Sequence, residues 1–164
     1  MNKIFRRAFL SMVALLFLIF ACACSAEPDK KTFTVEEMSI TLTDAFAEKP
    51  MLAQTACYET DDAMVTVLKD RGASFDPEMT LTEYAESVIL LNKLDQVNAF
   101  VQTDGNLVYF TFEQEVLDKD CSFMAFVYQN GETFWMIQFV CETDDAEEMT
   151  PVFFEYARSV AFAV

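Results

Sequence analysis

The stretch CSFMAFVYQNGETFWMIQFVC, residues 121–141, decides the fold of this 164-residue chain. Two apolar runs, Cys121–Gln129 and Glu132–Cys141, flank Asn130-Gly131, the dipeptide most typical of a two-residue hairpin loop. Apolar side chains would occupy both faces of this hairpin, so other elements must cover both faces. The pattern therefore predicts that the hairpin lies in the centre of a β-sheet.

The predicted loop also sets a register, in which Phe126 faces Trp135. In this register Cys121 and Cys141 point to opposite faces of the sheet and cannot bond. One extra residue in the turn, as in a β-bulge, would bring the two thiols side by side. In an oxidising compartment a Cys121–Cys141 disulfide would then form and leave Cys57 over.

Outward from the hairpin, apolar periodicity predicts further strands and two helices. Thr80-Leu81-Thr82-Glu83 is a capping box that starts an amphipathic helix. Thr150, followed by Pro151, predicts the start of a closing helix. The other expected strands are Thr32–Val35, Met38–Leu42, Met51–Tyr58, Met64–Asp70, Val97–Thr103 and Leu107–Val116. This order indicates an α+β fold, an antiparallel β-sheet flanked by helices.

The first residues of the chain have the pattern of an export signal. Three basic residues precede an apolar run at 8–21, which is shorter than the roughly 20 residues that a membrane-spanning helix needs. Small residues around Cys22 and Cys24 predict cleavage that leaves an N-terminal cysteine for lipid attachment, with Cys22 slightly favoured. Ordinary signal-peptidase cleavage and a retained signal anchor are the alternatives.

The chain is thus expected to have three parts: a lipoprotein-type export signal helix at 1–21, a short tether at 22–31 and a single α+β domain at 32–164. Loss of the signal removes three basic residues and no acidic ones, so eight basic and 27 acidic residues leave a net charge of −19. Such a surface repels nucleic acid and anionic headgroups. We expect attachment through lipid to a cell membrane or envelope surface.

Histidine is absent from the sequence, which removes the commonest general base and most zinc or copper sites. Glu113, Glu115, Asp118 and Asp120 offer carboxylate pairs of the kind that a glycosidase uses. They lie along a predicted strand and its turn, where exposed acids are ordinary. We therefore expect no catalytic residues, no cofactor and no metal site of the usual ligand types.

Two acidic segments, CYETDDA at 57–63 and CETDDA at 141–146, are near copies. Clustered carboxylates of this kind could bind a divalent cation such as Ca²⁺. The aspartates concerned are Asp61, Asp62, Asp144 and Asp145. A hairpin turn and a helix start account for the same residues without a ligand.

Aromatic residues are numerous, with 17 Phe, five Tyr and one Trp. Strand alternation places four of them in the core: Phe110, Phe112, Trp135 and Phe139. Three others could be displayed in a groove for an apolar or peptide ligand, or could fill the core: Tyr109, Tyr128 and Phe134.

Several segments resemble the PsbP-like fold, and specifically the DcrB-type lipoproteins of bacterial envelopes. These segments are Ser39-Ile40-Thr41-Leu42 followed by Phe46, then Met79–Ala85, Thr133–Phe139 and the closing Phe153–Val160. The resemblance implies an antiparallel sheet between helices and a non-catalytic assembly or accessory role. We expect a lipid-anchored binding or assembly module whose partner is another envelope protein. The alternative is a lipoprotein that binds a small ligand or a divalent cation through its acidic loops, and a carboxylate-dependent hydrolase is disfavoured.

Overall fold

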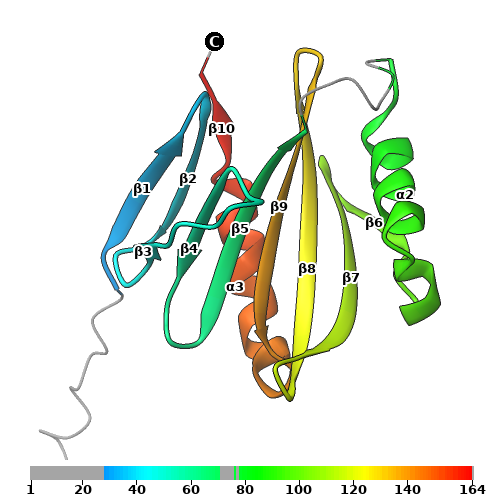
Figure 1. Ribbon diagram of the computed structural model, residues 1–164. Helices are drawn as coiled ribbons and strands as arrows, with labels where there is room; N and C mark the ends of the chain where they lie inside the picture. The colour runs from blue at the N-terminus through cyan, green and yellow to red at the C-terminus, as the bar shows by residue number, and fades with distance from the viewer. Residues whose placement is uncertain (1–27, 71–75, 77, 164) are drawn as a thin grey trace, which may run out of the picture.

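The computed structural model describes residues 28–70, 76 and 78–163. These residues form an α+β fold with two antiparallel sheets (Figure 1). The larger sheet has, in spatial order, β3 (Ala47–Glu48), β4 (Ala56–Glu59), β5 (Ala63–Asp70), β9 (Thr133–Glu142), β8 (Lys119–Asn130), β7 (Leu107–Val116) and β6 (Val101–Asp104). The smaller sheet has β1 (Lys30–Val35), β2 (Met38–Thr43) and β10 (Ala161–Phe162).

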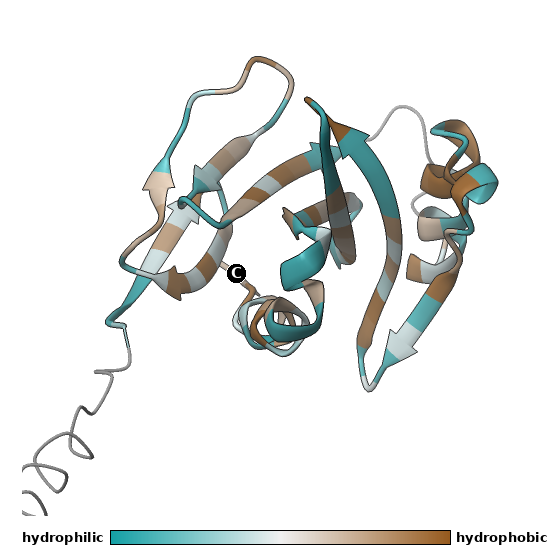
Figure 2. Ribbon diagram, turned by 90° about the horizontal axis from the view of Figure 1, so that it is seen from below, coloured by the Kyte–Doolittle hydropathy of each residue, from teal (hydrophilic) through white to brown (hydrophobic). Residues whose placement is uncertain are grey.

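The helices lie on opposite sides of the larger sheet (Figures 1 and 2). The helix α2 (Leu81–Leu91) covers one face, and a 3₁₀ turn, η1 (Leu94–Val97), follows it. The helix α3 (Ala146–Arg158), preceded by the 3₁₀ turn η2 (Thr143–Asp145), covers the other face together with the smaller sheet. We call the two faces of the larger sheet the α2 face and the α3 face.

The hairpin of β8 and β9 lies in the interior of the larger sheet, as the sequence predicted. Its register differs from the prediction, because Asn130 stays in the strand and pairs with Thr133. The loop is therefore Gly131-Glu132, with Gly131 at a φ of 61° that suits glycine. The register moves by two residues, so Phe126 pairs with Ile137 instead of Trp135. A shift of two keeps every side chain on its predicted face.

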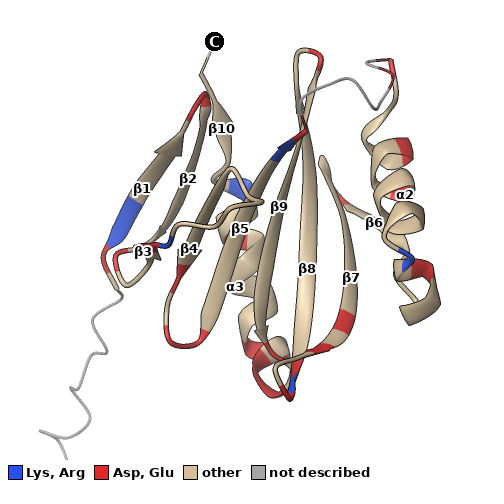
Figure 3. Ribbon diagram, viewed as in Figure 1, with Lys and Arg blue, Asp and Glu red and all other residues tan. Residues whose placement is uncertain are grey.

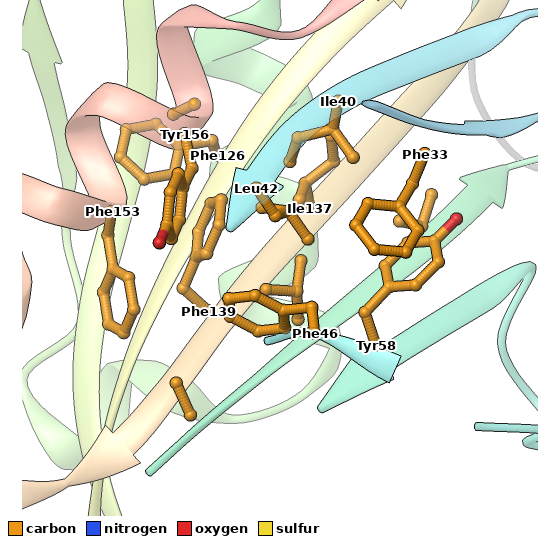
Figure 4. Close-up of a cluster of buried hydrophobic side chains, with 14 of the residues drawn as sticks. Phe33, Ile40, Leu42, Phe46, Tyr58, Phe126, Ile137, Phe139, Phe153 and Tyr156 are labelled. Atoms are coloured by element: carbon orange, nitrogen blue, oxygen red, sulfur yellow. The ribbon is translucent and has the colours of Figure 1, made fainter. Parts of the chain in front are cut away.

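The α3 face carries the main core (Figure 4). Trp135, Ile137 and Phe139 alternate along β9 and are fully buried. Helix α3 adds Phe153 and Tyr156, and the smaller sheet adds residues such as Ile40, Leu42 and Phe33. Each such side chain contributes about 1.5–3 kcal/mol through burial, which makes this cluster the main stabilising layer.

Polar contacts at two places connect the smaller sheet to the rest of the domain. Lys69 of β5 donates to Glu36 and Glu37 in the β1–β2 turn, with N–O distances of 2.7 and 2.6 Å. At the end of α3, Ser159 Oγ accepts from the backbone N–H of Thr41 at 2.9 Å. These contacts fix the orientation of β1 and β2 over the main core.

Three predicted elements begin or end elsewhere. The strand predicted at Met51–Tyr58 starts only at Ala56, and the one predicted at Val97–Thr103 starts at Val101. The closing helix begins at Ala146, a turn before the predicted start, so Pro151 lies inside it. Thr150 does not cap this helix, because its hydroxyl donates to the carbonyl of Ala146 at 2.7 Å.

Candidate functional site

The α2 face of the larger sheet is only partly covered by the described residues. Helix α2 packs over β6, β7 and β8 through Tyr84, Ala85, Val88 and Ile89. Its position is fixed at its start by the predicted capping box, in which Thr80 Oγ1 accepts from Glu83 N–H at 3.2 Å and the Glu83 carboxylate accepts from Thr80 N–H at 2.8 Å. The opposite edge of this face lies under the 49–55 segment (Figure 1).

A hollow of about 560 Å³ lies between α2 and the 49–55 segment, and we call it the α2 groove. Its apolar lining includes Leu68, Val88, Leu91, Leu94, Phe112, Phe123 and Met136. Its polar lining comprises Gln54, Asp70, Tyr84, Asn92, Gln114 and Gln138. A mainly apolar hollow with a few polar groups is the usual composition of a binding site in a protein.

An aromatic pair forms part of the floor of the α2 groove. Phe112 of β7 and Phe123 of β8 are directly opposite in the ladder, and their rings stack with centroids 4.7 Å apart and planes within 4°. Both side chains are half-buried. The structure therefore displays a rigid aromatic surface on the sheet.

The two walls of the α2 groove carry exposed apolar and amide groups. Leu91, on α2, is 73% exposed. Gln54 lies on the opposite wall, in a segment that also holds the fully exposed Leu52. This wall is anchored, since Thr55 N–H donates to Val67 O at 2.8 Å and Thr55 Oγ1 accepts from Lys69 N–H at 2.9 Å. Exposed apolar groups beside a hollow are typical of interaction surfaces.

Asp70 is the only carboxylate among the described residues that line the α2 groove. Within the described part of the chain its side chain has no hydrogen-bond or ion-pair partner. Partial burial raises the pKa of the Asp70 carboxyl above its usual value. Burial, and then the charge of Asp70, also raise the pKa of the Tyr84 phenol. The polar end of the groove is therefore suited to a cation.

For three aromatic residues the sequence left open both display in a groove and core packing. Phe134 is buried to 2% exposure and stacks on Tyr84 beneath α2. On the α3 face, Tyr128 donates to the carbonyl of Ala157 at 2.8 Å. Tyr109 stacks on Phe126 and meets Phe154 edge-on. All three therefore pack in or against the core, one of the two alternatives that the sequence left open.

Phe112 and Phe123 line the α2 groove instead, both half-buried, and Phe112 also packs against the core residues beneath α2, in line with its predicted core position. Phe110, Trp135 and Phe139 are buried as predicted. The sequence signal that would have found this stacked pair is the β7–β8 register. That register was hidden by an unusual turn, Leu117-Asp118, in which both residues have positive φ but neither is glycine or asparagine.

The two acidic segments meet at one end of the larger sheet, because Ala63 pairs with Cys141 in the β5–β9 ladder (Figure 3). Asp61 and Asp62 lie in the β4–β5 turn, and Asp144 and Asp145 lie in η2. In the described residues no group of three or more carboxylate, thiol or imidazole side chains is arranged to hold a metal ion. The turn and the helix start account for these aspartates.

The four carboxylates weighed for hydrolysis lie on the β7–β8 hairpin, and none of them lines the α2 groove. Glu113 and Glu115 are on β7, Asp118 is in its turn and Asp120 is on β8. All four of these side chains are exposed. Their placement is that of ordinary solvated acids on a strand and its turn.

The cysteines of the described part are free thiols. Cys121 pairs with Glu142, and Cys141 pairs with Ser122, so the two thiols point to opposite faces. The bulge that a Cys121–Cys141 disulfide requires does not occur in this hairpin. Burial raises the pKa of the Cys57 and Cys141 thiols, which makes both less reactive. The lipidation candidates Cys22 and Cys24, like the export signal, lie outside the described residues.

Most basic side chains of the described part are already engaged. Five of the seven form ion pairs: Lys30 with Glu155, Lys49 with Glu59, Lys69 with Glu36 and Glu37, Lys119 with Glu142, and Arg158 with Asp104. The remaining carboxylates are in large excess. The domain therefore presents a negative field to any partner. No helix in the described residues is long and apolar enough to cross a membrane.

No protein-family model matches the chain, and no curated protein matches it by sequence. Solved structures match it by fold. The solution structure of cyanobacterial PsbP from Synechocystis superposes with a TM-score of 0.56 at 14% identity, covering 87% of this chain and 97% of that one. The chain has a PsbP-like fold.

Two other structures of low sequence identity share this fold. The Ran-binding protein Mog1p of Saccharomyces cerevisiae matches with a TM-score of 0.54 at 10% identity, over 83% of this chain and 96% of that one. LpqN of Mycobacterium tuberculosis, described as involved in cell envelope biogenesis, matches with a TM-score of 0.50 at 8% identity, over 83% and 91%. At these identities the likeness concerns the fold alone.

Proposed function

We propose that the chain is an exported, lipid-anchored, non-catalytic module that binds another protein of the cell envelope. The pattern of residues 1–24 supports export and lipid attachment at Cys22 or Cys24. The resemblance to DcrB-type lipoproteins supports an envelope location. Two acyl chains on one cysteine satisfy the two-signal requirement for stable anchoring.

The observation that carries the binding role is the α2 groove, with Phe112 and Phe123 stacked on its floor and Leu91 exposed on its wall. Rigid aromatic residues that line a surface hollow are the usual anchors of protein–protein contacts. The ionisable groups that the described residues place in the groove are Asp70 and the Tyr84 phenol. This composition favours binding over acid–base catalysis, which needs paired groups of matched pKa.

The binding role is tested by photo-crosslinking in intact cells. A photoreactive phenylalanine analogue replaces Phe123 in the full chain, and a matched variant carries it at Glu155, an exposed position on α3. We expect one discrete protein adduct from position 123 and none from position 155. Equal, diffuse labelling from both positions, or no adduct from position 123, would contradict the binding role.

The anchor is tested separately by palmitate labelling. We expect incorporation into the wild-type chain and its loss in the Cys22→Ala variant, with Cys24→Ala as the comparison. If labelling is lost only in the Cys24→Ala variant, Cys24 and not Cys22 is the cysteine that carries the lipid. If the wild-type chain incorporates no palmitate, the proposed lipid anchor is wrong.

A further inference from the structure

The α2 face of the larger sheet holds only half of a covering layer. Helix α2 lies over β6, β7 and β8, and the 49–55 segment lies at the opposite edge. Between them lies the α2 groove, whose floor is formed by side chains of β5, β7, β8 and β9. Sheets in two-layer folds bury such a face against helices, so an element with the thickness of a helix would complete the layer beside α2.

The chemistry of the α2 groove restricts what that element can be. Its floor is apolar and aromatic, through Phe112, Phe123 and Met136, and therefore favours the apolar face of an amphipathic segment. Gln114 and Gln138 can bond to polar groups at the border of that face. Asp70 supplies a carboxylate that no described residue neutralises.

The net charge of the molecule indicates the sign of the charge on the segment that the α2 groove binds. The whole chain carries a net charge of −16, and five of seven described cations are already paired. A second copy of the chain would bring the same negative field and be repelled. A basic segment would be attracted over distance and would neutralise Asp70 on contact.

We propose that the α2 groove receives a cationic amphipathic helix of the partner protein, with its apolar face on Phe112 and Phe123 and a lysine or arginine against Asp70. This inference rests on the proposed binding function and specifies the kind of segment bound. The helix would lie next to Leu91, on the wall that α2 provides.

The test uses the full chain in cells, with the photoreactive analogue in place of Gln54, on the wall opposite Leu91. Leu91→Lys sets a positive charge inside the α2 groove. Leu90→Lys is its matched control, because Leu90 is 65% exposed on the same helix but does not line the groove. The two variants change the net charge equally, so they separate the local effect from the general field.

We expect Leu91→Lys to lower the adduct yield about tenfold, and Leu90→Lys to leave it within about twofold. Asp70→Asn should also lower the yield about tenfold, against the surface control Glu86→Gln. Thermal unfolding in cells verifies that all four variants stay folded. Mass spectrometry of the adduct should identify a segment with apolar residues at helical spacing and at least one lysine or arginine.

Equal yields from Leu91→Lys and Leu90→Lys would overturn the proposal, as would a crosslinked segment without a basic residue. An adduct with a second copy of the chain, or with a small molecule or lipid, would overturn it too. In those cases an adduct from position 123 would still support the binding function. If neither position gives any adduct, the binding function itself fails.

Discussion

Tyr84 of α2 and Phe134 of β9 stack with ring centroids 4.4 Å apart and ring planes within 7° of parallel. The contact joins the first turn of the helix to the centre of the larger sheet, next to the predicted capping box. It holds α2 over one side of the face and leaves the α2 groove beside it. The site thus depends on a core contact whose strength can be measured.

Replacement of Phe134 by alanine should lower the free energy of unfolding by about 3–5 kcal/mol, because a buried ring is lost and a cavity remains. Phe123→Ala should cost less, about 2 kcal/mol or below, since that ring is half-buried. Urea unfolding followed by fluorescence of Trp135, the single tryptophan, measures both. Equal costs would mean that Phe123 is a core residue and not a binding anchor.

Thr80→Ala should lower the free energy of unfolding by about 1 kcal/mol, because the hydroxyl that accepts from Glu83 N–H is lost. Thr82→Ala, two residues on and exposed, is the control and should have little effect. The same urea titration measures both variants. A loss at Thr82 as large as that at Thr80 would count against the cap as the cause.

Asp70→Asn should stabilise the fold at neutral pH. The pKa of Asp70 is raised in the folded state from its ordinary value of 3.8, so ionisation favours the unfolded chain. This penalty is present above the folded pKa and is relieved as the pH falls through it. The stability gained in Asp70→Asn should therefore shrink toward zero below about pH 3.8.

Melting temperatures of the two proteins at pH 7 and pH 3 measure this difference. A gain that persists unchanged at pH 3 would place its cause outside the carboxylate charge. Asp70→Asn should therefore make the protein more stable and its binding to the partner weaker. This opposition between stability and function is common at residues that take part in binding.

The cysteines should react unequally with iodoacetamide in the native protein. Cys121 is partly exposed, whereas Cys57 and Cys141 are buried and burial raises their pKa. We expect rapid alkylation of Cys121, and alkylation of the other two only after unfolding. Peptide mapping by mass spectrometry measures this, and protection of Cys121 in a non-reduced Cys121–Cys141 peptide would contradict the register found here.

The main lines of this fold were predictable because they follow from strong local patterns. Apolar residues on both faces of β8 and β9 indicate a central hairpin, and the capping box at Thr80 marks the start of α2. The β8–β9 loop moved by one residue, and the register by two, because Asn130 stays extended and within the loop Gly131 alone takes a positive φ. Local sequence could not distinguish these two loops.

The candidate site was not predictable from the same patterns. The partial burial of Phe112 and Phe123 depends on how far α2 extends across the face, and the long-range Tyr84–Phe134 contact helps to hold α2 there. Periodicity identifies which side of a strand is apolar but not whether another element covers it. Residues in the tight Leu117-Asp118 turn carry no turn signature, so the pairing of the two rings stayed hidden.

The central claim, that a partner occupies the α2 groove in the cell, is tested most directly by thiol footprinting. Leu91→Cys and Leu90→Cys are each labelled with a maleimide in intact cells and again after purification. Labelling at position 91 should be about tenfold slower in cells than in the purified protein, while position 90 reacts at the same rate in both. Equal rates at position 91 in the two settings would contradict the claim.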